Sequence, residues 1–187
     1  MKKICVYCGS SFGDRPDYRR AAEQLGTVLA ESGFHLVYGG GGVGLMGVVA
    51  NAALDSGGQV TGIITQGLVA IEAQNPRVDD MRVMTSMHER KKAMADLADA
   101  FIVLPGGFGT FEEMFEILTW AQLDIHRKPV GLLNISGYYD HLIDFMQYSV
   151  AEGFVKDPHF TMLQVGADPV GLLDQLAQYR YPVVSKL

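Results

Sequence analysis

Short apolar runs alternate with amphipathic stretches along the whole chain, and this alternation indicates the order of its elements. The apolar runs lie near residues 3–8, 34–38, 59–64, 81–85, 100–104, 129–134 and 160–165. The run at 100–104 has no polar residue, which is typical of a parallel strand that is buried on both sides. Between the runs, apolar residues recur at helical spacing in Tyr18 to Glu31, Leu45 to Leu54, Met87 to Ala98, Thr110 to Leu123, Tyr138 to Glu152 and Pro169 to Tyr179.

This regular exchange of strands and helices predicts the fold class. Strands separated by helices pair in parallel through crossover connections, and the helices cover the sheet. The 187 residues suit one domain, and the chain contains no internal repeat or linker. We therefore expect a single-domain α/β fold over residues 1–187, a Rossmann-like doubly wound parallel sheet of about seven strands with helices on both faces.

Glycine-rich loops follow three of the predicted strands, and their positions suggest one shared crevice. They are Gly9-Ser10-Ser11, the stretch 39–44 and the stretch 105–109. Open parallel sheets bind ligands beyond the carboxyl ends of their strands, so these loops are expected to converge there. Ser10 offers a hydroxyl group to that crevice, although a small residue in such a turn is as often only a turn former.

Composition and charge narrow the class of protein. A hydrophobic fraction of 48% and a net charge of -6 describe a globular chain whose acidic balance disfavours nucleic-acid binding. A single bound phosphate still needs only a local positive spot. The first apolar run ends at Gly9, too early for a signal peptide, and no stretch is long enough to span a bilayer. We expect a cytoplasmic protein without membrane contact.

The two cysteines, Cys5 and Cys8, lie within the first predicted strand. Residues three apart in a strand point to opposite faces, so these thiols are not placed to share a metal ion or to form a redox pair. We expect both to be buried structural residues, and we expect no metal site.

The stretch Leu104 to Glu113 joins a buried strand to a helix through three glycines. Thr110 is expected to cap that helix, and its free N–H groups suit a phosphate. Glu112 and Glu113, in the expected first turn, would repel the phosphate, and Thr110-x-x-Glu113 also fits an ordinary capping box. A capping box does not need the three glycines, however, so it does not explain why they are there. A site that holds both an anion and a carboxylate suits chemistry in which positive charge develops beside a phosphate ester.

A second capping box, Ser86-x-x-Glu89, places Arg90, Lys91 and Lys92 in the first turns of the next helix. Cations at that end oppose the helix dipole, so they are either a solvated surface or are held for an anionic ligand, and spacing alone does not decide. The position four after His88 is Lys92, so the zinc-binding H-E-x-x-H pattern is absent.

The glycines at 42–47 match the dinucleotide-binding pattern G-x-G-x-x-G. The pattern follows the second predicted strand instead of the first, and the next strand ends without an acidic residue for a ribose hydroxyl. No lysine follows in the spacing of a P-loop. Dinucleotide and nucleoside triphosphate binding are therefore disfavoured.

Three motifs together resemble those of the LOG family, the cytokinin riboside 5'-monophosphate phosphoribohydrolases long labelled lysine decarboxylases. The stretch 105–113 resembles the family signature PGGxGTxxE, and 87–91 resembles its second motif. The glycines at 39–41 and 44–47 resemble its first glycine loop. The similarity extends from Val6 to about Tyr139, and the three motifs occur in the family's order.

The resemblance implies roles for individual residues. Glu113 and Arg90 are expected to be catalytic. Substrate binding is expected from Ser10, Gly41, Glu72, Lys91, Gly106, Gly107, Phe108, Gly109, Thr110, Phe111, Glu112 and Thr119. Glu72 lies in the irregular stretch 66–80, which could also be a lid or an interface loop, and a solvated charge is its simpler interpretation. The resemblance also implies a homodimer, with the helix that bears Phe115, Leu118 and Trp120 at its interface.

The reaction expected from this set is hydrolysis of the N-glycosidic bond of an adenine-type nucleoside 5'-monophosphate, a cytokinin riboside 5'-monophosphate or AMP. The ribose gains oxocarbenium character as that bond breaks, and a carboxylate such as Glu113 stabilises it or activates water. No metal or organic cofactor is required. A non-catalytic nucleotide-binding module is the alternative, and it leaves Glu113 unexplained. A pyridoxal phosphate decarboxylase needs a lysine with a partner for the cofactor ring, and neither Lys91 nor Lys92 comes with such a set.

Overall fold

The computed structural model describes residues 1–69, 71 and 73–182, and within them one sheet contains seven strands. The strands are β1 (Lys3–Tyr7), β2 (His35–Tyr38), β3 (Val60–Thr65), β4 (Asp80–Met84), β5 (Ala100–Val103), β6 (Val130–Leu133) and β7 (Leu163–Gly166). The helices are α1 (Pro16–Glu31), α2 (Gly44–Asp55), α3 (Met87–Leu97), α4 (Phe108–Gln122), the 3-10 helix η1 (Ile135–Gly137), α5 (Asp140–Ala151), α6 (Asp157–Phe160) and α7 (Pro169–Gln178).

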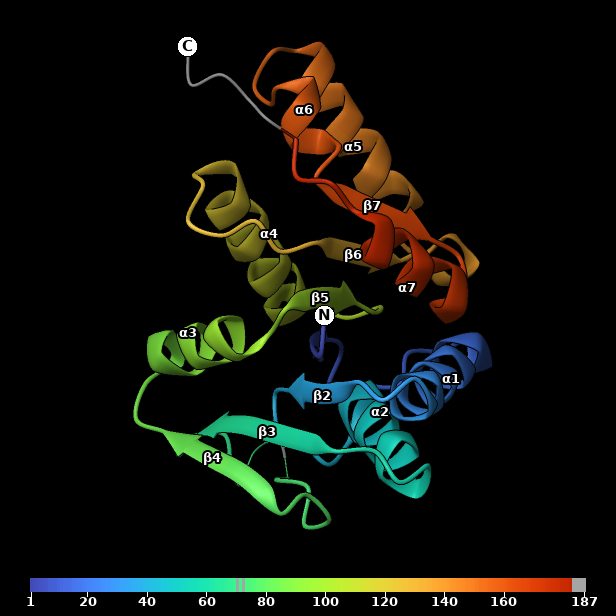
Figure 1. Cartoon of the computed structure of the whole chain (residues 1–187), viewed down its shortest axis with the longest axis vertical. Helices are drawn as coiled ribbons and strands as arrows, with labels where there is room; N and C mark the ends of the chain where they lie inside the picture. Colours follow the sequence, from blue (N-terminus) through green and yellow to red (C-terminus); the bar gives the residue numbers. More distant parts are fainter. Residues whose placement is uncertain (70, 72, 183–187) are drawn as a thin grey trace.

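All neighbouring strands are parallel, in the order β4-β3-β2-β1-β5-β6-β7. The chain moves outward from β1 to β4 at one edge, then returns to place β5 on the other side of β1 (Figure 1). The winding direction therefore reverses between β1 and β5, and their carboxyl ends diverge into a crevice where such folds bind ligands. The predicted doubly wound parallel sheet is confirmed.

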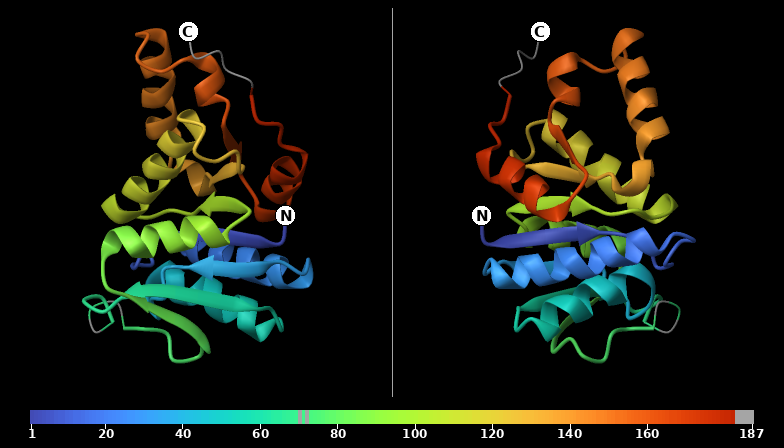
Figure 2. Two further views of the ribbon diagram at one scale, coloured as in Figure 1. Left: turned by 60° about the vertical axis from the view of Figure 1, so that its left-hand side comes forward. Right: turned by 90° about the vertical axis from the view of Figure 1, so that its right-hand side faces the viewer.

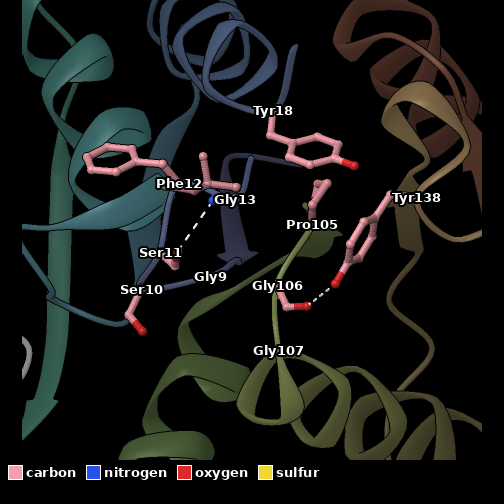
Figure 3. A pocket seen from close by; sticks show the side chains of 11 residues that line it. Gly9, Ser10, Ser11, Phe12, Gly13, Tyr18, Pro105, Gly106, Gly107 and Tyr138 are labelled. Atoms are coloured by element: carbon pink, nitrogen blue, oxygen red, sulfur yellow. Dashed lines mark hydrogen bonds between the residues drawn. The ribbon is translucent and has the colours of Figure 1, made fainter. Parts of the chain in front are cut away.

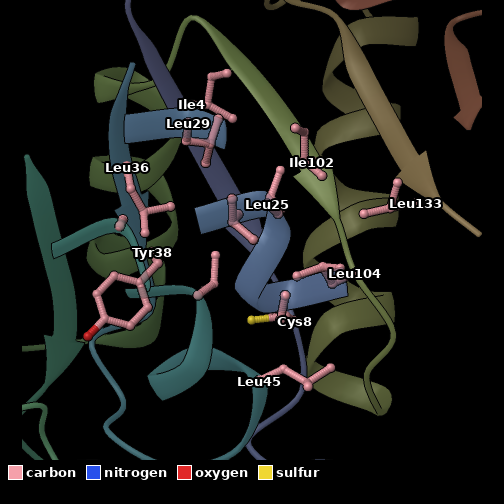
Figure 4. Close-up of a cluster of buried hydrophobic side chains, with 14 of the residues drawn as sticks. Ile4, Cys8, Leu25, Leu29, Leu36, Tyr38, Leu45, Ile102, Leu104 and Leu133 are labelled. Atoms are coloured by element: carbon pink, nitrogen blue, oxygen red, sulfur yellow. The ribbon is translucent and has the colours of Figure 1, made fainter. Parts of the chain in front are cut away.

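Two apolar layers hold the helices against the sheet. One lies under α1, α2 and α7 and includes Ile4, Leu25 and Leu172 (Figure 4). The other lies under α3, α4 and α5 and includes Met94 and Met114. Figure 2 shows that these two groups of helices lie on opposite faces of the sheet. Helices on both faces account for strands that are buried on both sides.

Strand alternation also settles the position of the cysteines. Cys8 belongs to the layer under α1 and α2, whereas Cys5 belongs to the opposite layer. Both thiols are buried, and neither forms a disulfide. The prediction of two separate structural thiols is confirmed, and burial raises the pKa of the Cys5 thiol, which keeps it protonated and unreactive.

The largest error in the predicted elements lies near the carboxyl end. A strand was expected at residues 160–165, but the short helix α6 ends at Phe160 and β7 begins only at Leu163. Pro158 lies in the first turn of α6, where its missing N–H costs nothing. The helix expected from Tyr138 begins instead at Asp140, after η1.

Candidate active site

The loops after β1, β2 and β5 meet at the crevice, as their glycines suggested. The Gly9 N–H donates to the Pro105 carbonyl at 3.0 Å, which joins the loops after β1 and β5. The Leu45 N–H, just after the β2 loop, donates to the Gly9 carbonyl at 3.0 Å. Backbone hydrogen bonds therefore fix the three loops against one another.

Two glycines permit this close packing. Gly44 has a φ of +64°, and a Cβ atom there would lie 2.2 Å from the carbonyl carbon of Ser10. A Cβ atom on Gly106 would lie 2.1 Å from the hydroxyl oxygen of Thr110 and 2.9 Å from the Gly9 nitrogen. Any side chain at either position would separate the loops, so both glycines are required by the backbone.

A cavity of about 310 Å³ opens between these loops, α1 and the connection after β6 (Figure 3). Its walls combine glycine backbone and serine hydroxyls with aromatic rings. It is lined by Gly9, Ser10, Ser11, Phe12, Gly13, Tyr18, Leu45, Pro105, Gly106, Gly107 and Tyr138. The cavity thus contains Ser10, Gly106 and Gly107 of the predicted substrate-binding set, beside rings that the sequence did not mark.

The start of α2 is not an anion site, although it carries the G-x-G-x-x-G pattern. The Leu45 and Met46 N–H groups donate to the Gly9 carbonyl, and Leu45 also reaches the Ser11 carbonyl at 3.3 Å. The Gly42 N–H donates to the Ala73 carbonyl at 2.7 Å. Amides that a dinucleotide pyrophosphate would need are therefore already bonded to the protein.

The start of α4 differs from the sequence-based prediction. The helix begins at Phe108, with Gly107 as its N-cap, so Thr110 lies inside the first turn and does not cap it. The predicted Thr110-x-x-Glu113 capping box is therefore wrong. Gly107, Phe108 and Gly109 are exposed, and the first four N–H groups of a helix have no partner within it. This exposed helix start suits a phosphate group.

The carboxylates of Glu112 and Glu113 lie farther along α4 than the sequence predicted, and both form ion pairs. Because α4 begins two residues earlier than expected, Glu112 and Glu113 lie in its second turn, and the first turn has no acidic residue. Each carboxylate forms an ion pair with a cation of α3. The expected repulsion between these carboxylates and a bound phosphate is thereby reduced.

Arg90 is the most enclosed charged residue of the crevice, with a side chain only 7% exposed. Its Nε donates to the Ile63 carbonyl at 2.9 Å, and its Nη2 donates to the Gly39 carbonyl at 3.2 Å. Its Nη1 lies 3.3 Å from Oε1 of Glu113, whose side chain is 12% exposed. The guanidinium is thus fixed between the carboxyl ends of β2 and β3 and the second turn of α4.

Lys91 lies beside this pair and binds two glutamates of α4. Its ammonium group contacts Glu112 and lies 3.0 Å from Glu116, and its own side chain is only 9% exposed. Burial lowers the pKa of Lys91, but the hydrogen bonds to Glu112 and Glu116 outweigh it and leave the pKa above its ordinary value. A lysine held charged in this way is a poor Schiff-base nucleophile.

The start of α3 has the cap that the Ser86-x-x-Glu89 pattern predicted. Ser86 caps α3 by accepting the Glu89 N–H at 3.2 Å. The Glu89 carboxylate turns back to Thr85, and these hydrogen bonds hold its pKa below the ordinary value. Lys92 points outward and pairs with Asp96. Arg90 and Lys91 thus both reach glutamates of α4, whereas Lys92 does not.

The irregular stretch 66–80 lies partly against the β2 glycine loop. The Asn75 N–H donates to the Gly40 carbonyl at 3.0 Å, and Gly41 pairs with Gln74 in an isolated bridge. Gly41 is therefore backed by this stretch. Glu72, a predicted substrate-binding residue, lies outside the described residues.

Thr119 is not brought together with the other predicted residues. It lies about 18 Å along α4 from Gly107, because a helix rises 1.5 Å per residue. Its hydroxyl donates to the Phe115 carbonyl of its own helix at 2.7 Å. Phe108 projects into solvent at the helix start, and Phe111 packs edge-on against Tyr139.

Tyr138 is a cavity-lining residue that the sequence did not single out. Its hydroxyl donates to the Gly106 carbonyl at 2.5 Å, and its ring forms part of the cavity wall. Helical spacing after β6 suggested only framework there. The contact joins residues 32 positions apart, so no local pattern could have shown it.

In the part of the chain that the structure describes, no group of three or more histidine, cysteine or acidic side chains is arranged to hold a metal ion. Among the same residues, no helix has the length and apolar character that crossing a bilayer requires.

Comparison with known proteins relates this geometry to a family. The family model described as possible lysine decarboxylase matches residues 46–176. The chain is 48% identical over 182 residues to the probable cytokinin riboside 5'-monophosphate phosphoribohydrolase LOGL5 of Oryza sativa subsp. japonica, covering 97% of this chain and 74% of that protein. It is 48% identical over 179 residues to the cytokinin riboside 5'-monophosphate phosphoribohydrolase LOG7 of Arabidopsis thaliana, covering 96% and 82%.

A solved structure supports the fold from a greater distance. The molybdenum cofactor binding protein of the phototrophic bacterium Rippkaea orientalis superimposes with a TM-score of 0.71 at 21% identity, covering 95% of this chain and 97% of that one. At this identity the likeness concerns the fold alone. The family model and the plant relatives carry the assignment: the chain belongs to the family described as possible lysine decarboxylase, the LOG family that its three motifs resemble.

Proposed function

We propose that this chain is a phosphoribohydrolase of nucleoside 5'-monophosphates. Its substrates are cytokinin riboside 5'-monophosphates, AMP or both, and its products are the free adenine-type base and ribose 5-phosphate. The plant relatives carry this activity in their names. The observation that carries the proposal is the enclosed pair of Arg90 and Glu113 beside the exposed start of α4.

The exposed helix start supports binding of the 5'-phosphate. The backbone from Gly107 to Thr110 supplies N–H groups at the positive end of the α4 dipole. Ser10, in the loop after β1, lies on the side of the Gly106–Gly107 turn that faces away from Tyr138, and it offers its hydroxyl group there (Figure 3). We assign the phosphate to this corner and the sugar to the space towards Glu113.

Glu113 is assigned to the reacting carbon of the ribose. As the N-glycosidic bond breaks, its electron pair leaves with the base, and C1' of the ribose becomes electron-deficient. A carboxylate in an enclosed site stabilises that charge and can accept a proton from the water that attacks C1'. The leaving base takes up one proton, and C1' takes up the hydroxyl group of the attacking water. One water molecule is therefore consumed for each bond that is broken.

Arg90 is assigned to hold Glu113 and the substrate in place. Its contacts with Ile63, Gly39 and Glu113 fix the guanidinium plane, and a rigid, always charged fork suits a sugar hydroxyl or phosphate oxygen. Lys91 binds both Glu112 and Glu116 and balances one of their two negative charges, which leaves the corner less negative for an anionic substrate.

We also propose a homodimer formed through the outer face of α4. Of the residues expected at the interface, Phe115 is exposed, whereas Leu118 and Trp120 are partly buried and pack against the core. Phe108, at the start of the helix, and Leu123, its C-cap, are also exposed, and spacings of seven and eight residues place them on the side of Phe115. Exposed apolar residues in a row mark an interaction surface. Thr119 lies on the same face, so its proposed substrate contact would be made to the site of the partner chain.

One experiment tests the activity directly. The protein is incubated with AMP, an isoprenoid-modified AMP, the other common nucleoside 5'-monophosphates and adenosine, and the products are separated by chromatography. We expect free adenine or modified adenine from the adenine-type monophosphates and very little from adenosine, because the site devotes its helix start to an anion. Binding of AMP without release of base would support a non-catalytic module instead.

A further inference from the structure

The carbonyls of residues 104–106, between β5 and α4, all accept hydrogen bonds from outside the turn. The Tyr139 hydroxyl donates to the Leu104 carbonyl at 2.8 Å, and the Tyr138 hydroxyl donates to the Gly106 carbonyl at 2.5 Å. The Pro105 carbonyl, between them, is held by the loop after β1. Two consecutive tyrosines from the connection after β6 thus bind a turn that is more than thirty positions away in the sequence.

Because a trans peptide is planar, the hydrogen bond from Tyr138 to the Gly106 carbonyl also orients the N–H group of Gly107. The carbonyl of one residue and the N–H of the next belong to the same plane and point in opposite directions. Tyr138 therefore directs the Gly107 N–H away from itself. In Figure 3, Tyr138 approaches the turn from one side, and Ser10 lies on the other. The Gly107 N–H is thus turned towards the side on which Ser10 lies.

We propose that Tyr138 is a positioning residue, which aims the Gly107 N–H at the 5'-phosphate of the substrate. This inference rests on the proposed function, because it takes the phosphate at the α4 start as given. The peptide between Gly106 and Gly107 needs such a restraint. It precedes the first residue of α4, so no helical hydrogen bond holds its carbonyl, and glycines on both sides leave it free to rotate.

The Tyr138 side chain is itself held in place. Its ring meets Tyr139 edge-on, with centroids 4.7 Å apart, and meets Tyr18 edge-on at 5.5 Å. Burial raises the pKa of Tyr138, so its hydroxyl keeps the proton that it donates. A side chain fixed by two rings presents its hydroxyl in one place, and this is what a positioning role requires.

Tyr139 supplies a matched control within the same turn. Its hydroxyl also binds a carbonyl, but the peptide after Leu104 leads into Pro105, which has no N–H. Tyr139 therefore has no amide to aim. Its ring is only 1% exposed, so its bond supports the fold. Removing either hydroxyl is the same chemical change, with different expected effects.

The test compares Tyr138→Phe and Tyr139→Phe by calorimetric titration with ribose 5-phosphate and by AMP kinetics. For Tyr138→Phe we expect affinity for ribose 5-phosphate to fall about tenfold and the KM for AMP to rise similarly, with kcat within about threefold of the wild type. Its melting temperature should change by less than about 2 °C. For Tyr139→Phe we expect a melting temperature lower by about 3 °C or more, with affinity nearly unchanged.

Two outcomes would overturn the inference. One is unchanged affinity for ribose 5-phosphate in Tyr138→Phe, which would leave the tyrosine without a role in binding. The other is an equal loss of affinity in both variants, which would mean that the hydroxyls only support the turn. Release of adenine from AMP by the wild-type protein tests the proposed function separately, since the titrations need no turnover.

Discussion

Nη1 of Arg90 lies 3.3 Å from Oε1 of Glu113, and this contact joins α3 to α4 above the carboxyl ends of the strands. The arginine comes from the half of the chain that forms β1 to β4, and the glutamate comes from the half that forms β5 to β7. Both side chains are largely enclosed, so the pair is poorly screened by solvent. The two proposed catalytic groups therefore depend on each other for position and for charge balance.

Glu113→Gln should abolish most turnover while preserving binding. The amide keeps the size of the side chain and can still accept a hydrogen bond from Arg90, but it carries no charge to stabilise the oxocarbenium ion. We expect kcat to fall about a hundredfold or more, with AMP affinity and melting temperature close to the wild type. Single-turnover base release and AMP titration measure both quantities. Turnover at the wild-type rate would refute the assigned role.

Arg90→Ala should weaken nucleotide binding, turnover and stability together. It removes the hydrogen bonds to the Ile63 and Gly39 carbonyls and breaks the ion pair with Glu113. Breaking a buried pair on one side costs about 3–5 kcal/mol, and the partial exposure of Glu113 places the expected loss near the lower value.

The double variant Arg90→Ala with Glu113→Gln separates stability from chemistry. It also removes the negative charge that has lost its arginine, so we expect denaturation to show partial recovery of stability relative to Arg90→Ala. Base release should stay as low as in Glu113→Gln. Unchanged AMP affinity and turnover in Arg90→Ala would return this residue to a purely structural role.

Substitution on the outer face of α4 should dissociate the proposed dimer. Phe115 is 40% exposed, so Phe115→Asp places a charge in the interface with little damage to the core. We expect sedimentation to show a dimer for the wild type and a monomer for this variant at micromolar concentration. Val170→Asp, at a residue of similar exposure on α7, is the control and should leave the association state unchanged. A monomeric wild type would remove the proposal.

Stability should decrease as pH falls through the range of histidine titration, in part because of His126. Its Nε2 contacts the Ile117 carbonyl at 2.9 Å and its Nδ1 accepts the Lys128 N–H at 3.1 Å, which defines a neutral ring. Burial lowers the pKa of His126 below its ordinary 6.5. The unfolded chain therefore binds a proton first as pH falls, and the folded state loses stability below about pH 6.5.

The measurement is the melting temperature between pH 7.5 and 5.5. We expect His126→Gln, which does not titrate, to lose about 2 °C less than the wild type over this range. His141→Gln, at an exposed position of α5, should follow the wild-type curve. Identical pH profiles for His126→Gln and the wild type would show that this ring does not contribute.

The fold could be predicted because its signal is local and repeated. Each buried strand is an apolar run, each helix has its own spacing, and strands separated by helices pair in parallel. The strand start near α6 was misplaced because Phe160 begins the apolar run 160–165 in the sequence but ends the short helix α6 in the structure. Short segments of this kind are decided by packing, which a local pattern does not contain.

The site could be predicted only in part. The distinction of Arg90 and Lys91 from Lys92 follows from their motif, but the N-cap of α4 does not. The sequence offers Thr110 as a cap, whereas the backbone uses Gly107, because a glycine can hold the extended conformation of a cap without a side-chain bond. Tyr138 was missed for a different reason, since its partner is Gly106, far away in the sequence.

The position of β1 between β2 and β5 has a consequence for biosynthesis. Strand β1 is made before both of its neighbours, and one of them, β5, begins only at Ala100. During translation the nascent chain can pair β1 with β2 early, yet it must keep the other edge of β1 open until β5 has left the ribosome. An open edge is a template for wrong pairing. The crevice is therefore assembled late, and nascent chains that stall before α4 expose this edge.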